Sequence, residues 1–285
     1  MRCLVISLCA ITILSATQAV GQTLSGMRSE AREPRRASAP APRRTKNRSR
    51  SSYDPYCDDD DNGLDDLAGQ LVGYAFLAAA STPFVVPRAA LDDDGDPAWY
   101  PDYPYDAQHA GMVFDENLPG VHNSLIVLQA DYGADFDDLN HAHGRLFGDI
   151  SQRIGFDSEF YYRHENVATA NGNDELWNGD VNFTYRFAQN EFWQFRAGLG
   201  VNWLHDRIGT EAGINTTYGV EYFPQDPWVL GSVIDWGRIG STSLFHYRGT
   251  VGWTHNGWGV FTGYDYLGLG GEKIHAWING VEYRF

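Results

Sequence analysis

The sequence predicts an all-β fold, an up-and-down antiparallel β-barrel of about ten strands over residues 122–285. Three observations predict it. From residue 122 onward, apolar and polar side chains alternate with a period of two, as on a β-strand. Turn sequences such as Asn256-Gly257 separate the alternating segments. The segments also have the length of tilted strands that cross a membrane, which need about 9–11 residues.

The expected strands follow one another with short connections. They lie near residues 123–133, 142–150, 153–164, 175–188, 191–204, 210–223, 227–237, 243–254, 257–267 and 273–285. Longer polar loops at 133–142 and 165–174 alternate with tight turns, which is the asymmetry between the two sides of a membrane barrel. An even strand number places both ends of the barrel on the periplasmic side, where we also expect the N-terminal tail.

The aromatic side chains indicate which face of the strands meets lipid. A soluble barrel turns its apolar face inward, but here the apolar rows begin and end with aromatics, and mostly smaller side chains lie between. Trp and Tyr prefer the two membrane interfaces because part of each ring system is apolar and part forms hydrogen bonds. We therefore expect lipid against this face. The predicted belt residues are Trp193, Trp203, Trp228, Trp236, Phe245, Trp253, Trp258, Tyr266, Trp277 and Phe285.

The opposite rows carry glycine and charge, which predicts a polar lumen. Both signs of charge occur at similar depths, so we expect ion-pair networks across the lumen. A ten-stranded barrel is only just wider than one that its own side chains fill, which disfavours a wide aqueous pore. The predicted lumen charges are Asp157, Glu159, Arg163, Asp180, Arg186, Arg196, Glu221, Glu282 and Arg284.

The C-terminal strand gives the chain its one family resemblance. The paired aromatic rows and the ending Val281-Glu282-Tyr283-Arg284-Phe285 resemble the small bacterial outer-membrane β-barrels of eight to twelve strands. The resemblance covers residues 122–285. It implies an outer-membrane location, contact with membrane lipid and with the barrel-assembly machinery, and Val281, Tyr283 and Phe285 as the assembly signal. It brings no catalytic motif.

The N-terminal segment predicts export. Residues 1–22 combine Arg2, a short apolar run and small residues before a cleavage site, as in a signal peptide. Residues 23–52 are rich in Arg, Pro and Ser and predict a disordered tail. The basic stretch from Arg28 to Arg50 is either a solvated linker or a tether to an anionic envelope polymer. From residue 51 onward 35 acidic groups oppose 11 basic ones, which disfavours nucleic-acid binding.

Residues 53–121 form an acidic connecting segment. A helix is expected over about 63–81, ended by Pro83 and Pro87, and residues 83–121 are expected to be irregular. Alternate oxygen ligands before a glycine resemble a calcium loop, although the closing glutamate is missing, so an acidic helix cap is the competing interpretation. No other cofactor is expected. The calcium candidates are Asp58, Asp60, Asn62 and Asp65.

Catalytic patterns are weak. Ser158 and His164 share the apolar row of one strand, but six residues separate them by about 20 Å, too far for a nucleophile and its base. His141 and His143 favour a polar loop end, with a metal site as the alternative. We therefore predict a non-enzymatic envelope barrel with a structural or surface role. The alternatives are a narrow pore for small solutes, a lipid-modifying outer-membrane hydrolase and a soluble ligand-binding barrel.

Overall fold

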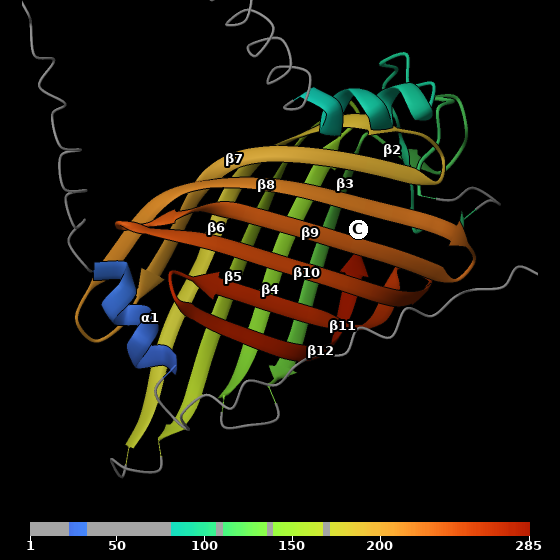
Figure 1. Ribbon diagram of the computed structural model, residues 1–285. Helices are drawn as coiled ribbons and strands as arrows, with labels where there is room; N and C mark the ends of the chain where they lie inside the picture. The colour runs from blue at the N-terminus through green and yellow to red at the C-terminus, as the bar shows by residue number, and fades with distance from the viewer. Residues whose placement is uncertain (1–22, 33–80, 107–110, 136–138, 168–171) are drawn as a thin grey trace, which may run out of the picture.

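The computed structural model describes residues 23–32, 81–106, 111–135, 139–167 and 172–285. Ten antiparallel strands in sequence order form a closed barrel, which confirms the predicted fold class (Figure 1). Each strand lies within three residues of its predicted bounds at both ends. The strands are β3 (Ser124–Ala134), β4 (Leu139–Ile150), β5 (Ile154–Val167), β6 (Gly172–Gln189), β7 (Trp193–His205), β8 (Thr210–Gln225), β9 (Trp228–Ile239), β10 (Thr242–His255), β11 (Trp258–Leu269) and β12 (Glu272–Arg284).

The barrel closes where β12 pairs with β3. This seam runs from the Trp277↔Ala134 pair to the Arg284↔Val127 pair. The backbones of Phe285 and Ile126 then exchange two further hydrogen bonds. We call the end of the barrel where β3 begins and β12 ends the proximal end, and the other end the distal end.

Successive residues of each strand face opposite sides of the wall. Along β3, Ile126 and Leu128 are exposed on the outside, whereas Gln129 and Asp131 are buried inside. This alternation follows from the pleat of a strand, which directs successive side chains to opposite faces. The barrel therefore has an apolar outer wall and a polar inner wall.

The connections are shorter than predicted. Strand β4 begins at residue 139 and β5 extends to residue 167, so the loops expected at 133–142 and 165–174 shrink to four residues each. Most of the polar residues that were assigned to these loops belong instead to the ends of the neighbouring strands. The length difference between distal loops and proximal turns is consequently small.

Helix α1 (Thr23–Arg32) corrects the prediction of disorder for the first ten residues of 23–52; the rest of that segment lies outside the described residues. It lies at the distal end, at the left of Figure 1, whereas the tail was expected at the proximal side. Its buried side chains are Leu24, Met27 and Ala31, at three- and four-residue spacing, which makes one helix face apolar. The tertiary contacts of that face stabilise a helix whose composition alone predicts none.

Residues 81–90 are also helical, which corrects the prediction that Pro83 and Pro87 end a helix before an irregular segment. The carbonyl of Pro87 accepts a hydrogen bond from Leu91 N at 3.0 Å, because proline lacks only the N–H donor. Tyr218 of the outer wall donates to the Pro83 carbonyl, and the ring of Phe84 packs on it, so the helix contacts the outside of the barrel.

A two-stranded sheet, β1 (Tyr100–Pro101) with β2 (Val121–His122), completes the described elements. None of the helices in the described ranges is long and apolar enough to cross a membrane. The signal peptide, the helix expected over about 63–81 and the calcium candidates Asp58, Asp60, Asn62 and Asp65 lie outside the described residues.

Candidate functional site: the polar lumen and its two end caps

The inner wall is lined by buried charged side chains. Every predicted lumen charge points inward, and none is more than 7% exposed. These residues are Asp157, Glu159, Arg163, Asp180, Arg186, Arg196, Glu221, Glu282 and Arg284. Removing a charge from water is costly unless a partner compensates it, so their contacts determine what the lumen is.

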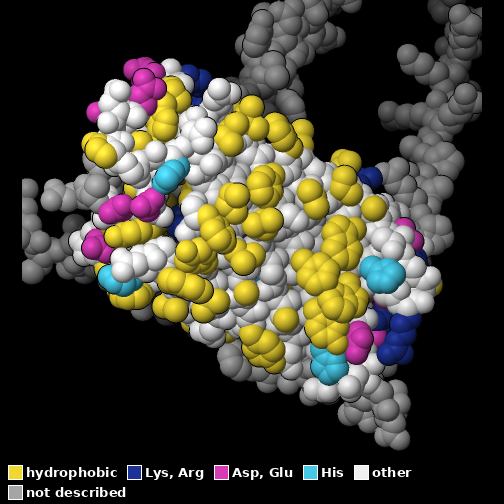
Figure 2. Space-filling model, turned by 180° about the vertical axis from the view of Figure 1, so that it is seen from behind, with side chains coloured by type: hydrophobic (Ala, Val, Ile, Leu, Met, Phe, Trp, Pro, Cys, Tyr) yellow, Lys and Arg dark blue, Asp and Glu magenta, His cyan; other side chains and the backbone are white. Residues whose placement is uncertain are grey.

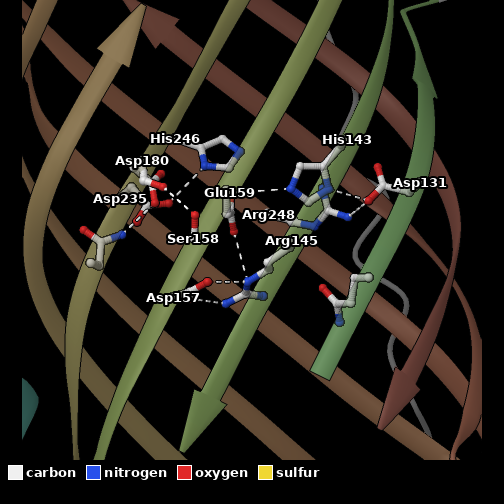
Figure 3. Close-up of polar contacts among 12 residues, drawn as sticks. Asp131, His143, Arg145, Asp157, Ser158, Glu159, Asp180, Asp235, His246 and Arg248 are labelled. Atoms are coloured by element: carbon white, nitrogen blue, oxygen red, sulfur yellow. Dashed lines mark hydrogen bonds and ion pairs between the residues drawn. The ribbon is translucent and has the colours of Figure 1, made fainter. Parts of the chain in front are cut away.

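One ion-pair network crosses the lumen. Arg145 of β4 donates to Asp157, and its Nε lies 3.2 Å from Glu159 Oε1. Arg248 of β10 donates to Asp131 of β3, two strands beyond its nearest neighbour in the wall. The first contact joins adjacent strands and the second joins strands three apart in the wall; Figure 3 shows both.

A second network lies toward the proximal end. Glu221 lies 3.0 Å from Arg196 Nη2 and 3.3 Å from Arg284 Nη2. Arg284 also contacts Glu282, which accepts a hydrogen bond from Gln129 at 3.0 Å. This group ties β3, β7, β8 and β12 together through side chains.

A third group centres on His246. Its Nδ1 lies 3.0 Å from Asp235 Oδ2, and its Nε2 lies 3.0 Å from Asp265 Oδ2. The Tyr161 hydroxyl is 3.2 Å from the same Nε2. The ring of Tyr161 in turn stacks on His143, with centroids 4.2 Å apart.

About half of these charged groups were not predicted from the sequence. They include Asp131 and Arg145 in the first two strands of the barrel, and residues of the later strands, where His246 and Arg248 alternate with Phe245 and Tyr247. That alternation was the available pattern. The missed buried residues are Asp131, His143, Arg145, Asp149, Asp235, His246, Arg248 and Asp265.

The prediction that His141 and His143 end a polar surface loop is wrong. Both lie in β4 and face the lumen, 1% and 4% exposed. The strand begins three residues earlier than expected, at Leu139, which is buried in one apolar cluster with Leu24 and Met27 of α1.

Two small cavities lie between the lumen side chains. One cavity of about 20 Å³ borders Arg145, Arg196, Glu221 and Glu282. Another cavity, of about 10 Å³, borders Asp180, Asp235 and His246. A single water needs a cavity of roughly 10–15 Å³, so the larger cavity holds about one or two waters and the smaller at most about one.

The segment between residues 91 and 113 caps the proximal end. Asp93 forms a bidentate contact with Arg153 at the turn after β4, and the Tyr100 hydroxyl contacts Arg186. Burial would raise the pKa of Asp93, but hydrogen bonds from Arg153 and from the backbone outweigh it and lower the pKa below its usual value. An apolar cluster under this cap contains Ala98, Tyr100, Met112, Leu125, Val127 and Phe147.

Helix α1 caps the distal end. Glu165 accepts hydrogen bonds from the first backbone N–H groups of the helix, at Thr23 and Leu24, where unpaired donors favour an anion. The apolar face of α1 covers a ring at the barrel mouth. The ring consists of Leu139, Leu176, Leu204, Ile239, Leu244, Leu267, Leu269 and Ile274.

Two basic residues of the predicted polymer tether take part in this cap. Arg28 contacts Asp174, and its Nε lies 2.9 Å from Asp206. Arg32 donates to Asp206 at 2.8 Å. These two guanidinium groups are therefore engaged by the barrel; the other basic residues up to Arg50 lie outside the described part of the chain.

Asp206 is the electrostatic anchor of the distal cap. Burial would raise its pKa, but the hydrogen bond from Arg32 and the backbone N–H groups of Ile208 and Gly209 outweigh it and lower the pKa to about 2. Asp206 in turn raises the pKa of Arg32. The cap is thus held by a fully ionised pair at neutral pH.

All ten predicted belt residues lie on the outer wall. Trp193, Trp203 and Tyr266 are half-buried there. Seven are 42–61% exposed: Trp228, Trp236, Phe245, Trp253, Trp258, Trp277 and Phe285.

The strand register aligns these aromatics in two bands. Near the proximal end Trp228 pairs with Trp253, and near the distal end Trp236 pairs with Phe245. Between the bands lie smaller exposed residues such as Leu199 and Val201. Figure 2 shows apolar side chains across the middle of one face of the barrel, with charged groups toward its two ends.

The hydrolase alternative depends on Ser158 and His164, which both lie on the outer face of β5. The Ser158 hydroxyl donates to the backbone carbonyl of Asp180 at 3.3 Å. Its neighbours across the strands are Leu146 and Val181. These contacts give the hydroxyl no base.

The fold and the chemistry of the two walls define the class of transmembrane-type antiparallel β-barrels. No family model and no curated protein matches the sequence.

Solved outer-membrane proteins resemble the chain only distantly. The Yersinia pestis protein Ail has 11% identity and a TM-score of 0.34, over 57% of this chain and 100% of Ail. An outer membrane channel from Pseudomonas putida F1 has 11% identity and a TM-score of 0.36, over 57% and 95%. The KdgM porin has 11% identity and a TM-score of 0.32, over 56% and 99%. This similarity is too low to support the fold, which is established by the pairing of the strands in the barrel.

Proposed function

We propose that this chain is an exported outer-membrane β-barrel with a side-chain-filled lumen and a structural or surface role in the envelope. The observation that carries the proposal is the inversion of the usual protein pattern, with apolar residues outside and ion pairs inside. A water-soluble ligand-binding barrel needs the reverse arrangement. The band between the two aromatic rows suits hydrocarbon, so membrane lipid is the partner that this surface fits.

The filled lumen is supported by three features of the interior. Arginines pair with carboxylates both on adjacent strands and across several strands, the cavities beside them hold at most about one or two waters, and both ends are capped. Such a lumen conducts ions poorly, because a permeating ion has to separate buried ion pairs.

The test is reconstitution of the exported protein in planar bilayers, together with the washed membranes that contain it. We expect retention in the outer-membrane fraction, heat-modifiable migration in detergent and a silent current trace. Discrete conductance steps from the full-length protein would contradict the filled lumen. Extraction by salt or alkali without detergent would contradict membrane insertion.

A narrow pore is the second candidate, and the distal cap is the observation that favours it. Helix α1 is held by side-chain contacts such as the Arg32–Asp206 pair, so release of α1 would uncover the barrel mouth. Deletion of residues 23–32 separates the candidates. The filled-lumen proposal expects the deletion variant to stay non-conducting, whereas the pore proposal expects it to open.

A further inference from the structure

The inner wall between the caps carries more acid than base among the described residues. Nine buried carboxylates face six buried guanidinium groups and three buried histidines, an excess of three negative charges when the histidines are neutral. The carboxylates are Asp131, Asp149, Asp157, Glu159, Asp180, Glu221, Asp235, Asp265 and Glu282, and the arginines are Arg145, Arg163, Arg186, Arg196, Arg248 and Arg284. An uncompensated buried carboxylate is costly, so the excess indicates that a further cation or proton belongs here.

The excess is concentrated at Asp180. Of the nine carboxylates it is the one that makes no ion pair with any described residue. It is 6% exposed and accepts a hydrogen bond from Asn182 Nδ2 at 2.7 Å. Across the strands it lies directly opposite Glu159, another carboxylate, in the β5–β6 register. Like charges in opposing positions destabilise a sheet unless something lies between them.

Three buried groups near Asp180, though not Asp180 itself, are close enough together to hold one metal ion. One ligand atom each from Glu159, Asp235 and His246 lies within 4.8 Å of the others, and all three residues are buried. The cavity of about 10 Å³ beside them is bordered by Asp180, Asp235 and His246. Glu159 Oε1 accepts no hydrogen bond, although Arg145 Nε is 3.2 Å away. Figure 3 shows Asp180 and Asp235 side by side below His246.

We propose that Glu159, Asp180, Asp235 and His246 bind one divalent cation of the zinc class inside the lumen. Carboxylate oxygens together with one imidazole nitrogen suit Zn²⁺ better than Ca²⁺ or Mg²⁺, which prefer oxygen ligands alone. A bound dication removes two of the three excess negative charges and separates Asp180 from Glu159.

The contacts of His246 support this assignment. Its Nδ1 faces Asp235 and its Nε2 faces Asp265. With Nδ1 as the ligand, the Nε2–H donates to Asp265, which is the carboxylate partner that metal-bound histidines commonly have. Arg163 also borders the cavity, and its Nη2 lies 4.0 Å from the other oxygen of Asp265, Oδ1.

The test uses the full-length exported protein folded in detergent and dialysed against a zinc-containing buffer and then a zinc-free one. We expect about one retained zinc per chain by elemental analysis, and a zinc-dependent rise of the melting temperature that EDTA reverses. Mg²⁺ and Ca²⁺ at equal concentration produce no comparable rise. A wild-type protein that retains no zinc and melts at the same temperature with and without zinc overturns the proposal.

Two variants and two controls locate the site. Asp180→Asn and His246→Gln each weaken zinc binding by about 10–100-fold or more, the effect typical of lost metal partners. Asp180→Asn also raises the melting temperature of the metal-free protein, because it relieves the repulsion from Glu159. Glu221→Gln, a lumen carboxylate paired with arginines, and His275→Gln, on the outer wall, retain zinc. Zinc binding unchanged in Asp180→Asn and His246→Gln, or lost in His275→Gln, contradicts the site.

Discussion

The outer and inner walls of the barrel are built from alternate residues of the same strands, yet their chemistry is opposite. In β7, Leu199 and Val201 are 70% and 50% exposed on the outside, whereas Arg196 and Asn202 are 5% and 2% exposed inside. In a water-soluble protein the exposed side chains would be the polar ones. The difference fits the proposal that hydrocarbon surrounds the outer wall, with buried ion pairs inside in place of a hydrophobic core.

The largest expected effect tests the inner wall. Arg145→Met leaves Asp157 and Glu159 buried without their cation, so the free energy of unfolding falls by about 3–5 kcal/mol. Urea unfolding in lipid or detergent, followed by heat-modifiable migration, measures it. The double variant Arg145→Met, Asp157→Asn recovers part of the loss. A loss under about 1 kcal/mol for the single variant would mean that water reaches these carboxylates.

The outer wall is tested by Val201→Arg. Val201 lies on the outer row of β7 between Trp193 and Trp203, nearer to Trp203, and a charge within the apolar band costs up to about 2–4 kcal/mol in a membrane barrel. Val201→Ile is the matched control and leaves stability nearly unchanged. Gly200 does not serve as an inner control, because a Cβ there would lie 2.0 Å from the Val181 carbonyl oxygen; Asn202→Ser does. Equal costs at Val201 and Asn202 would contradict the difference between the walls.

The distal cap gives a pH prediction. The folded-state pKa of Asp206 is about 2, below its ordinary value near 3.8, so the carboxylate contributes stability above pH ~4. That contribution, about 2 kcal/mol at most, is lost as the pH falls from ~4 to ~2. A spin label at Ser29→Cys, in a Cys57→Ser background, reports α1. We expect an immobilised label at pH 7 that becomes mobile below pH 3, and in Asp206→Asn a label whose mobility is less pH-dependent.

The smallest effect concerns the closing seam. Removal of Phe285 deletes the two backbone hydrogen bonds with Ile126, worth about 1–2 kcal/mol together. By resemblance to outer-membrane barrels, it also reduces assembly in cells. Phe285→Tyr retains the backbone and the aromatic ring and serves as the control. Normal amounts of inserted barrel without Phe285 would argue against the assembly role of Val281, Tyr283 and Phe285.

Local alternation was sufficient to predict the strands. The period of two and the turn residues locate all ten strands to within three residues at each end. This works because, apart from the closing β12–β3 pair, each strand of the barrel pairs with strands that are near it in the sequence, so the local pattern also sets which face is buried. The two helices escaped prediction for a different reason. The apolar face of α1 packs against Leu176 and Ile239, which lie more than 140 residues further along the sequence. A local sequence pattern does not predict such a contact.

The sequence predicted that charged residues of the strands face the lumen, but not which of them form ion pairs with one another. Alternation shows that Asp180 and Glu159 face inward, but not that the register sets them opposite each other. Nor does it show that Arg248 reaches Asp131 from across the barrel, since that pairing depends on barrel diameter and strand stagger. Which charge meets which partner is therefore a tertiary property.

The most direct test of the outer wall uses the intrinsic tryptophans of the protein in bilayers of brominated phospholipid. Eight of the nine tryptophans lie in the strands on the outer wall, and the ninth is Trp99 in the proximal cap. Two aromatic bands predict strong quenching, greater with bromine near the headgroups than near the acyl chain ends. Fluorescence equal to that in unbrominated lipid, with quenching by aqueous iodide instead, would contradict a wall that faces hydrocarbon.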